Sequence, residues 1–200
     1  MARDILDLAS AAWQVGQVGR QPFMLQPVDD RSTVASWLPA RVPGDIRADL
    51  LAAGRISSLD TPDGIAQSAW VDDQDWWYRT ALEAAGNDTT VVLEADGIDY
   101  ASSVWLDGAC LARHAGMFAR QSIALSPHLN AAGPHELAIR VWGGGALPLT
   151  PDPPSRRMVR GLLGRLGMGA EYFPDRMATP KAQFSFGWDF SPRVLSAGIW

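Results

Sequence analysis

The sequence predicts a mostly β fold, an antiparallel β-sandwich or barrel with one or two short helices, from its composition, its turns and its periodicity. The acids are eighteen Asp and only four Glu, and the cations are sixteen Arg and one Lys, so good helix formers are scarce. Nineteen Gly and fourteen Pro supply turns. Several short segments alternate polar and apolar residues, as strands do. We therefore expect residues 1–200 to form a single domain with its own core.

The clearest helix signal is a short segment that ends at Gly54. Asp45 is placed to cap its first turn, and Ile46, Leu50 and Ala53 share one face of a helix. Glycine suits the position just after a helix. The sequence therefore predicts a short helix over 45–53.

A period of two begins near residue 75 and predicts a series of short strands. They span residues 75–83, 89–95, 100–106, 111–114, 117–125 and 136–142. Gly86-Asn87-Asp88 forms a turn after the first strand, and Asp107-Gly108 favours a type I′ hairpin turn after the third. Many short strands with turns between them are typical of an antiparallel sandwich or barrel.

The remaining segments have weaker patterns. Residues 1–30 are interpreted as a lead-in, and residues 143–180, rich in Gly and Pro, as an irregular loop insertion. Within that insertion, Arg156 to Met168 has some helical character. Strand-like order returns over 183–190 and 193–200.

Charge and cysteine content exclude several classes. A net charge of −5 argues against a protein that binds nucleic acid through phosphates. No segment approaches the roughly 20 apolar residues of a membrane span. Asp4 and Asp7 interrupt the apolar stretch that a signal peptide needs, and Cys110 is the single cysteine. We therefore expect a cytoplasmic protein with no nucleic-acid or membrane partner.

The sequence offers no motif for catalysis, metal binding or cofactor binding. The histidines His114, His128 and His135 lack a cysteine partner at ligand spacing. No G-x-S-x-G nucleophile motif is present, and the glycine clusters lack the Lys-Ser or Lys-Thr of a phosphate loop. The glutamates Glu83, Glu94 and Glu136 fall inside predicted strands and do not identify an acid/base couple. We therefore predict no catalytic residue, no metal and no cofactor.

The nine tryptophans are more informative. An indole offers a flat apolar face that suits the C–H face of a sugar ring, and a nearby carboxylate can bind its hydroxyls. Most of the nine are expected in the core, but Trp188 with Asp189, and Trp76 and Trp77 beside Asp75, combine the two chemistries.

The segment around Trp188 makes a structural demand. In a regular strand, neighbouring residues such as Trp188 and Asp189 point to opposite faces and cannot both contact one ligand. If they act together, the backbone must bend near Gly187 or near Pro192.

Five stretches, in order, carry a resemblance to a known family. They are WLPARVPGDIRADLL (37–51), DWWYRT (75–80), LEADGIDYASSVWLDG (93–108), HAGMF (114–118) and FGWDFSPRVLSAGIW (186–200). In these the chain resembles the N-terminal sugar-binding domain of glycoside hydrolase family 2, most closely its β-mannosidase branch. The resemblance implies a jelly-roll β-sandwich of the galactose-binding-like type.

The resemblance also implies roles for particular residues. In the family a Trp-Asp pair reaches the terminal sugar subsite, so Trp188 would be an aromatic wall and Asp189 a hydroxyl-binding carboxylate. Trp76, Trp77 and Arg193 are secondary candidates. The family pattern W-D-W-G-P reads here Trp188-Asp189-Phe190-Ser191-Pro192, with two departures.

In the family the two catalytic glutamates lie in a (β/α)₈ barrel that follows an immunoglobulin-like domain, and these 200 residues contain neither. We therefore expect a non-catalytic sugar-binding and scaffold domain of a longer β-mannosidase-like hydrolase. Its expected partners are a terminal β-glycoside and the remaining domains of the enzyme. A free-standing carbohydrate-binding module or lectin is the alternative, and a protein-docking role for Arg156 to Arg165 is a third hypothesis.

Overall fold

The computed structural model describes residues 5–84, 90–129, 133–147, 149, 155, 158–159, 162, 176, 178–187 and 192–200. The predicted turn at 86–88 and the arginines Arg156, Arg157, Arg160 and Arg165 lie outside these residues. So does most of the predicted insertion over 143–180.

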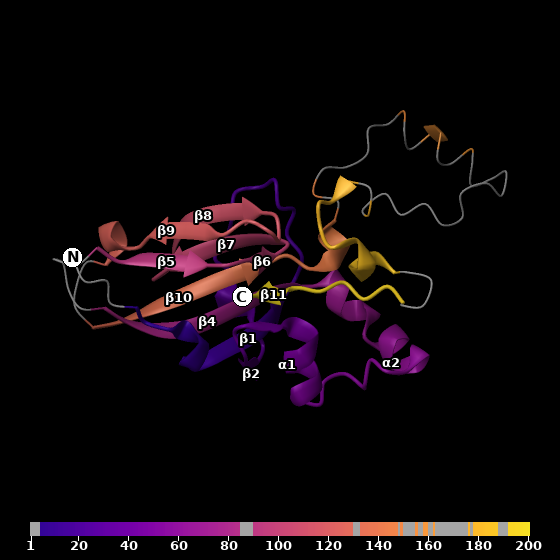
Figure 1. The fold of residues 1–200 in the computed structure, drawn as a ribbon, viewed down its shortest axis with the longest axis horizontal. Helices are drawn as coiled ribbons and strands as arrows, with labels where there is room; N and C mark the ends of the chain where they lie inside the picture. The colour runs from indigo at the N-terminus through magenta and orange to yellow at the C-terminus, as the bar shows by residue number, and fades with distance from the viewer. Residues whose placement is uncertain are drawn as a thin grey trace.

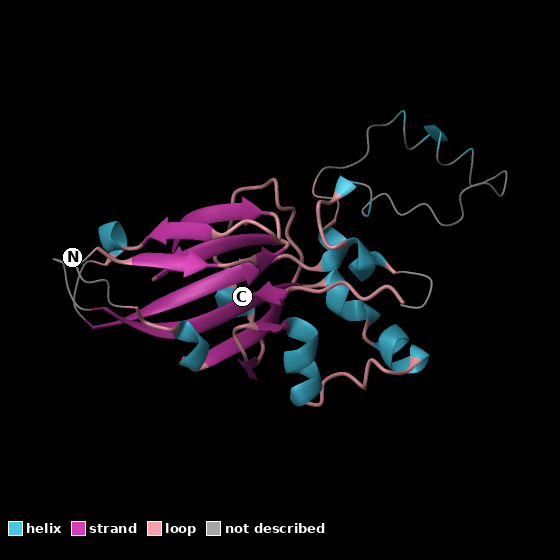
Figure 2. Ribbon diagram, viewed as in Figure 1, coloured by secondary structure: helices cyan, strands magenta, loops and turns pink. Residues whose placement is uncertain are grey.

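The described chain is mostly β, as predicted, and its strands lie together while α1 and α2 lie beside one end of them (Figures 1 and 2). The strands are β1 (Trp13–Val18), β2 (Trp37–Ala40), β3 (Gly44–Asp45), β4 (Asp75–Ala84), β5 (Val92–Ala95), β6 (Ile98–Asp99), β7 (Ala101–Leu106), β8 (Ala109–Ala115), β9 (Gln121–Ala124), β10 (Gly133–Val141) and β11 (Gly198–Ile199). The α-helices whose bounds fall within the described residues are α1 (Ile46–Ala52) and α2 (Pro62–Gln67). Short 3₁₀ helices are η1 (Leu8–Ser10), η2 (Arg31–Thr33), η3 (Ala69–Asp73), η4 (Ser126–His128), η5 (Gly144–Ala146) and η6 (Gln183–Phe186).

The strands form a six-stranded sheet in the order β2-β1-β4-β10-β7-β8, a three-stranded sheet β3-β11-β6 and a pair β5-β9, and these pairings are antiparallel. The β7–β8 hairpin turns at Asp107 (φ 48°) and Gly108 (φ 85°), the two positive φ values that a type I′ turn needs. The turn predicted from Asp107-Gly108 is therefore confirmed.

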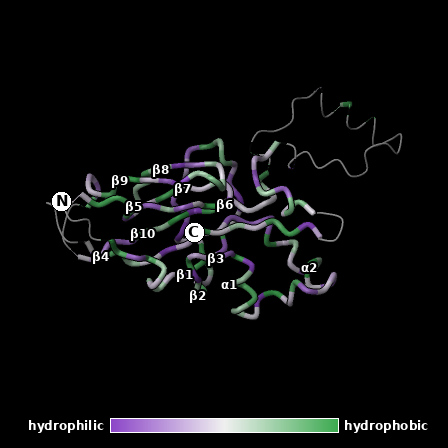
Figure 3. Tube along the Cα trace, viewed as in Figure 1, coloured by the Kyte–Doolittle hydropathy of each residue, from purple (hydrophilic) through white to green (hydrophobic). Residues whose placement is uncertain are grey.

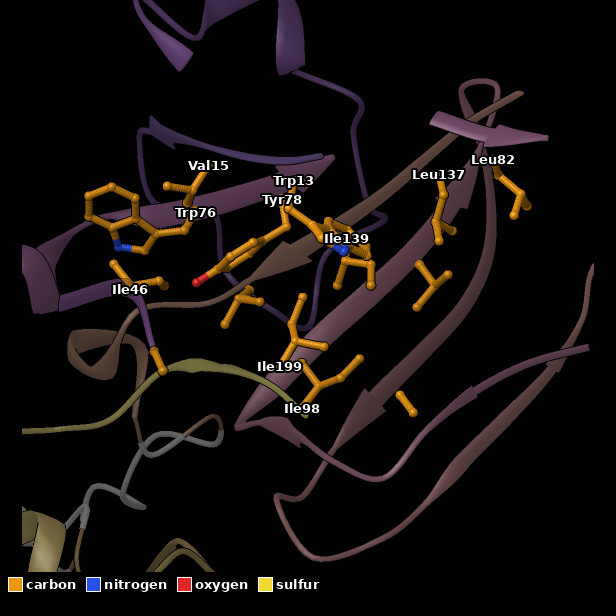
Figure 4. Packing of buried hydrophobic residues seen from close by; sticks show 14 of the residues in the cluster. Trp13, Val15, Ile46, Trp76, Tyr78, Leu82, Ile98, Leu137, Ile139 and Ile199 are labelled. Atoms are coloured by element: carbon orange, nitrogen blue, oxygen red, sulfur yellow. The ribbon is translucent and has the colours of Figure 1, made fainter. Parts of the chain in front are cut away.

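The main core lies between the large sheet and the smaller sheets. Tyr78 and Ile139 of the large sheet belong to one buried cluster with Ile98 of β6 and Ile199 of β11, and Figure 4 shows these side chains gathered together. Ile46 of α1 joins the same cluster, so α1 and the smaller sheets form the opposing layer. Figure 3 shows the mixture of hydrophobic and hydrophilic residues along the trace that such two-faced strands require. The antiparallel β-sandwich is confirmed.

The opposite face of the large sheet carries a second buried cluster. Trp77, Trp105 and Ala138 are buried there, with Val34 and Trp37 packed against them. Trp77 and Trp105 meet edge to face, with ring centroids 5.6 Å apart. Both faces of the sheet centre are therefore covered, one by the sandwich and the other by the chain that follows β1.

A buried guanidinium holds this second cover in place. Arg140 of β10 is fully buried, and its Nη1 donates to Asp30 Oδ1 at 2.5 Å while its Nη2 donates to Asp75 Oδ2 at 2.8 Å. Asp30 Oδ1 also accepts from Trp77 Nε1 at 2.7 Å, and Asp75 Oδ2 accepts from the backbone N of Gln21 at 2.8 Å. Arg140 thus ties β4 and β10 to the chain around residues 21–30.

Residues 1–30 are more than the predicted lead-in, because β1 is an interior strand paired with both β2 and β4. Its alternation is interrupted by Gly16, which conceals the strand in the sequence. The glycine has a steric reason: a Cβ at this position would lie 2.4 Å from Val34 Cγ1.

The predicted helix is confirmed as α1, which begins after Asp45 and ends before Gly54. Asp49, on its inner face, accepts from Arg41 N at 3.0 Å and from Tyr78 Oη at 3.4 Å. Burial raises the pKa of Asp49 from 3.8 to about 6, against the opposing effect of these donors.

Arg140→Met should lower the free energy of unfolding by about 3–5 kcal/mol, because it leaves the buried carboxylate of Asp75 and the partly buried one of Asp30 without their cation. The matched control is Arg120→Met, which breaks the exposed Arg120–Asp96 pair (2.6 Å). Its cost should stay within about 1 kcal/mol. Equal losses for both variants in urea denaturation would contradict the role of Arg140.

Asp49→Asn should change how stability depends on pH. Because the folded-state pKa is raised, the native chain holds this proton more tightly, and stability falls as pH rises from about 4 to 6. The unfolding free energy of Asp49→Asn minus that of the wild type should therefore rise by about 1–3 kcal/mol between pH 4 and 7. Asp63→Asn, at an exposed position of α2, is the control, and a flat difference for Asp49→Asn would contradict the shift.

Candidate functional site

Trp188 and Asp189, the predicted sugar-binding pair, lie outside the described residues. Both flanks of the pair are described, as residues 178–187 and 192–200. Arg193, a secondary candidate, lies on the second flank and is half-buried. The candidate site is therefore built here from its flanks and from the elements that hold them.

The first flank is not the strand predicted over 183–190. Gln183–Phe186 form η6, in which Gly187 N donates to Phe184 O at 3.2 Å. Phe184 is 72% exposed and Phe186 only 1%, whereas alternation would place both on one face. The prediction failed because apolar residues at every second position also fit a 3₁₀ turn. In this turn Phe186 is buried and Phe184 lies on the surface.

The backbone bends at Gly187, which has φ 95° and ψ 146°. This positive φ is disfavoured for residues with a Cβ, so glycine suits the position. The sequence predicts a bend near Gly187 or Pro192 if Trp188 and Asp189 act together; the chain bends at Gly187, and the pair itself lies outside the described residues.

An aromatic contact joins the two flanks. The Phe186 ring is buried, and the guanidinium carbon of Arg193 lies 5.2 Å from its centroid. A cation over an aromatic face is a favourable contact, more so when it is partly removed from water. Arg193, on the second flank, therefore contacts the first flank through Phe186.

A buried lysine joins the flanks a second time. Lys181 Nζ contacts Asp99 Oδ2 of β6 and donates to Ser196 O at 2.8 Å and to Ser196 Oγ at 3.1 Å. Ser196 Oγ in turn donates to Asp99 Oδ2 at 2.6 Å. Burial lowers the pKa of Lys181, although the Asp99 carboxylate partly opposes this shift. One ammonium thus connects residues on either side of 188–191 to the same strand.

The start of α1 holds the second flank. The backbone N of Ala197 donates to Asp45 Oδ2 at 2.8 Å, and Ile46 N donates to Ala197 O at 2.8 Å. Arg47, also buried, donates from Nη1 to Leu195 O at 2.5 Å and from Nη2 to Asp72 Oδ1 at 2.9 Å. The chain leading into β11 is therefore bound along its length by α1.

The two flanks and the elements that hold them carry three cations and three acids. The cations are Arg47, Lys181 and Arg193, and the acids are Asp45, Asp72 and Asp99. Burial is the largest influence on Asp45 and Asp72 and raises the pKa of each. These side chains orient the backbone of residues 195–197 and balance one another's charge.

The two other tryptophan candidates are packing residues in this structure. Trp76 is 1% exposed and Trp77 0%, and they lie on opposite faces of β4. Their indole N–H groups donate inward, to Val71 O at 3.2 Å and to Asp30 Oδ1 at 2.7 Å. Neither ring has a face open to a sugar, because each is packed inside one of the two buried clusters on either side of β4.

The described residues contain neither a group of metal-ligating side chains nor a membrane-spanning helix. No three His, Cys, Asp or Glu side chains there are grouped as a metal ion would require. None of the helices in the described ranges has the length and apolar character that crossing a membrane requires.

The sequence reasoning missed Lys181, Asp99 and Ser196. A signal was present, since Lys181 is the one lysine of a chain that otherwise uses arginine. Its partners could not be inferred, because Asp99 lies 82 residues away along the chain.

An antiparallel β-sandwich with the short helices α1 and α2 beside it is the fold of a galactose-binding-like domain. The chain belongs to the family described as glycosyl hydrolase 2 galactose-binding domain-like, whose model matches residues 13–200.

Its relatives are named as mannosidases. Beta-mannosidase B of Aspergillus terreus is 30% identical over 183 residues, which cover 89% of this chain and 20% of that protein. The crystal structure of beta-D-mannosidase from Dictyoglomus thermophilum superposes with a TM-score of 0.71 at 26% identity, covering 99% of this chain and 22% of that one. The exo-chitosanase CsxA of Amycolatopsis orientalis shares the fold, with a TM-score of 0.53 and 17% identity. The chain thus spans about a fifth of the length of the curated relatives that it matches.

Asp45→Ala should destabilise the chain more than an ordinary loss of a helix cap. It removes the acceptor of Arg47 N and also leaves the backbone N of Ala197 without its partner, so we expect a loss of about 2–4 kcal/mol. Thr61→Ala, which removes only the cap of α2, is the control and should cost about 0.5–2 kcal/mol. Equal losses in chemical denaturation would show that the Asp45–Ala197 contact adds nothing.

Proposed function

We propose that this chain is a non-catalytic sugar-binding and scaffold domain of a β-mannosidase-like glycoside hydrolase. It contributes to the terminal sugar subsite of an enzyme that hydrolyses O-glycosidic bonds. The observation that carries the proposal is the family match over residues 13–200 together with relatives named beta-mannosidase B, of which the chain covers 20%.

Trp188 and Asp189 are the proposed contacts with the sugar. An indole stacks on the C–H face of a pyranose, and a carboxylate accepts hydrogen bonds from its hydroxyls. The first flank supports this proposal, because η6 and the positive φ of Gly187 mean that the chain does not reach Trp188 as a regular strand. The buried charged side chains that hold the second flank also support the proposal, because a binding site needs contacts in a fixed orientation.

Catalysis is assigned to other domains of the enzyme. Hydrolysis of a glycoside needs two carboxyl groups on either side of the scissile bond, about 5 to 9.5 Å apart. In the family these are glutamates of the barrel. The partners in this proposal are therefore a terminal β-glycoside and the remaining domains of the hydrolase.

The assignment of catalysis is tested with the 200-residue chain and aryl β-mannoside, β-galactoside and β-glucuronide substrates. We expect no turnover above the rate without protein. Turnover that disappears in Asp189→Ala would overturn the assignment.

Sugar binding is tested by titrating the chain with methyl β-D-mannoside and following its NMR spectrum. A dissociation constant in the millimolar range is expected, since the chain supplies only part of the subsite. Asp189→Ala should weaken binding at least tenfold, as the loss of a charged hydrogen bond does. Asp63→Ala, at an exposed position of α2, should leave binding unchanged.

The same titration separates the alternatives. Micromolar affinity would favour a free-standing carbohydrate-binding module or lectin. Binding that Trp188→Ala and Asp189→Ala leave unchanged would contradict the proposed contacts. The absence of binding at tens of millimolar would contradict sugar binding by this chain alone.

A further inference from the structure

Lys181 stands apart in both sequence and structure. It is the one lysine beside sixteen arginines, and it is 3% exposed. A buried ammonium is costly unless every donor is satisfied and an anion lies close. Here its neighbours are the Asp99 carboxylate, the Ser196 carbonyl and the Ser196 hydroxyl. Its three N–H donors therefore have three acceptors.

The geometry explains why this position uses lysine. An ammonium is a compact charge that directs three donors around one point, whereas a guanidinium is a planar fork that needs acceptors in its plane. Two of the three acceptors belong to a single residue, Ser196, whose hydroxyl also donates to Asp99. The ammonium of Lys181 lies between Asp99 and Ser196, and we expect the larger planar group of an arginine to match these acceptors less well.

The place of this cluster in the chain gives it a second role. Lys181 precedes the segment 188–191 and Ser196 follows it, so the contact closes a loop of the chain. Within that loop, Phe186 and Arg193 make a second contact across the same flanks. Both flanks are thereby anchored at Asp99 of β6, beside β11 in the small sheet.

A stabilising role alone does not account for such an arrangement. Buried ion pairs commonly contribute little more stability than apolar side chains of similar volume. Their distinct effect is to fix one geometry, because few arrangements satisfy all donors and acceptors. A cluster that fixes the geometry of both flanks is therefore expected to set the orientation of the segment 188–191 between them. The proposed function assigns the sugar contacts to that segment.

We propose that Lys181 is a positioning residue that, with Asp99 and Ser196, fixes the flanks of the segment 188–191 and so orients Trp188 and Asp189 for the sugar. This inference rests on the proposed function for the identity of the ligand. The positioning itself can be measured without any sugar.

The main experiment uses 5-fluorotryptophan and ¹⁹F NMR on the whole chain, which has nine tryptophans. The Trp188 signal is assigned by its loss in Trp188→Phe. The test variant is Lys181→Met with Asp99→Asn, which removes the link to Ser196 without leaving a buried charge unpaired. Its matched control is Arg120→Met with Asp96→Asn, which makes the same two changes at an exposed ion pair.

In the test variant we expect the Trp188 signal to shift or broaden while those of Trp76 and Trp77, in the two cores, keep their positions. The control should leave all signals in place. Lys181→Arg should resemble the test variant, because arginine restores the charge but not the geometry. A folded test variant with an unchanged Trp188 signal would overturn the proposal.

If the test variant loses all tryptophan signals together, Ser196→Ala decides the question. It removes one acceptor of Lys181 and keeps the Lys181–Asp99 pair, so the fold is retained. A shift confined to Trp188 is then expected, and no shift would overturn the proposal.

A titration with methyl β-D-mannoside separates this inference from the proposed function. The test variant should bind at least tenfold more weakly than the wild type, as Asp189→Ala does, and the control should bind equally well. If Trp188→Ala and Asp189→Ala leave affinity unchanged, the proposed function fails. The ¹⁹F result would still report whether Lys181 orients Trp188.

Discussion

The buried guanidinium of Arg140 is the constraint on which the rest of the sandwich depends. A central sheet in a small domain needs cover on both faces, and here one cover is an irregular chain rather than a second sheet. Irregular chain has few backbone partners of its own, so its polar groups must find others. Asp30 and Gln21 find them through Arg140 and Asp75, which lie on adjacent strands β10 and β4.

The same solution recurs around β6 and β11, in the other layer of the sandwich. There the chain leading to β11 has no long strand to pair with, and it is held by Asp45 and Arg47 at the start of α1 and by Lys181. In both places a buried charge fixes irregular backbone to a regular element. The described flanks of the segment 188–191 are therefore held by ionic contacts as well as by the sandwich.

Local patterns were enough to predict the elements with a strong signal of their own. β4 and β10 alternate over many residues, Asp107-Gly108 specifies a hairpin turn, and α1 has both a cap and an apolar face. β1 was missed because Gly16, required by the close approach of Val34, interrupts its alternation. The 3₁₀ turn before Gly187 was taken for a strand because spaced phenylalanines satisfy either pattern.

The sequence by itself determined the fold class, the position of most central strands, the family and the need for a bend beside Trp188. Those features depend on residues close together in the chain, where periodicity and turn preference act. Only the tertiary structure decided that Trp76 and Trp77 are buried and that Lys181 joins Asp99 to Ser196. Burial and ionic pairing depend on which distant segments meet, and the pattern of neighbouring residues does not specify those long-range contacts.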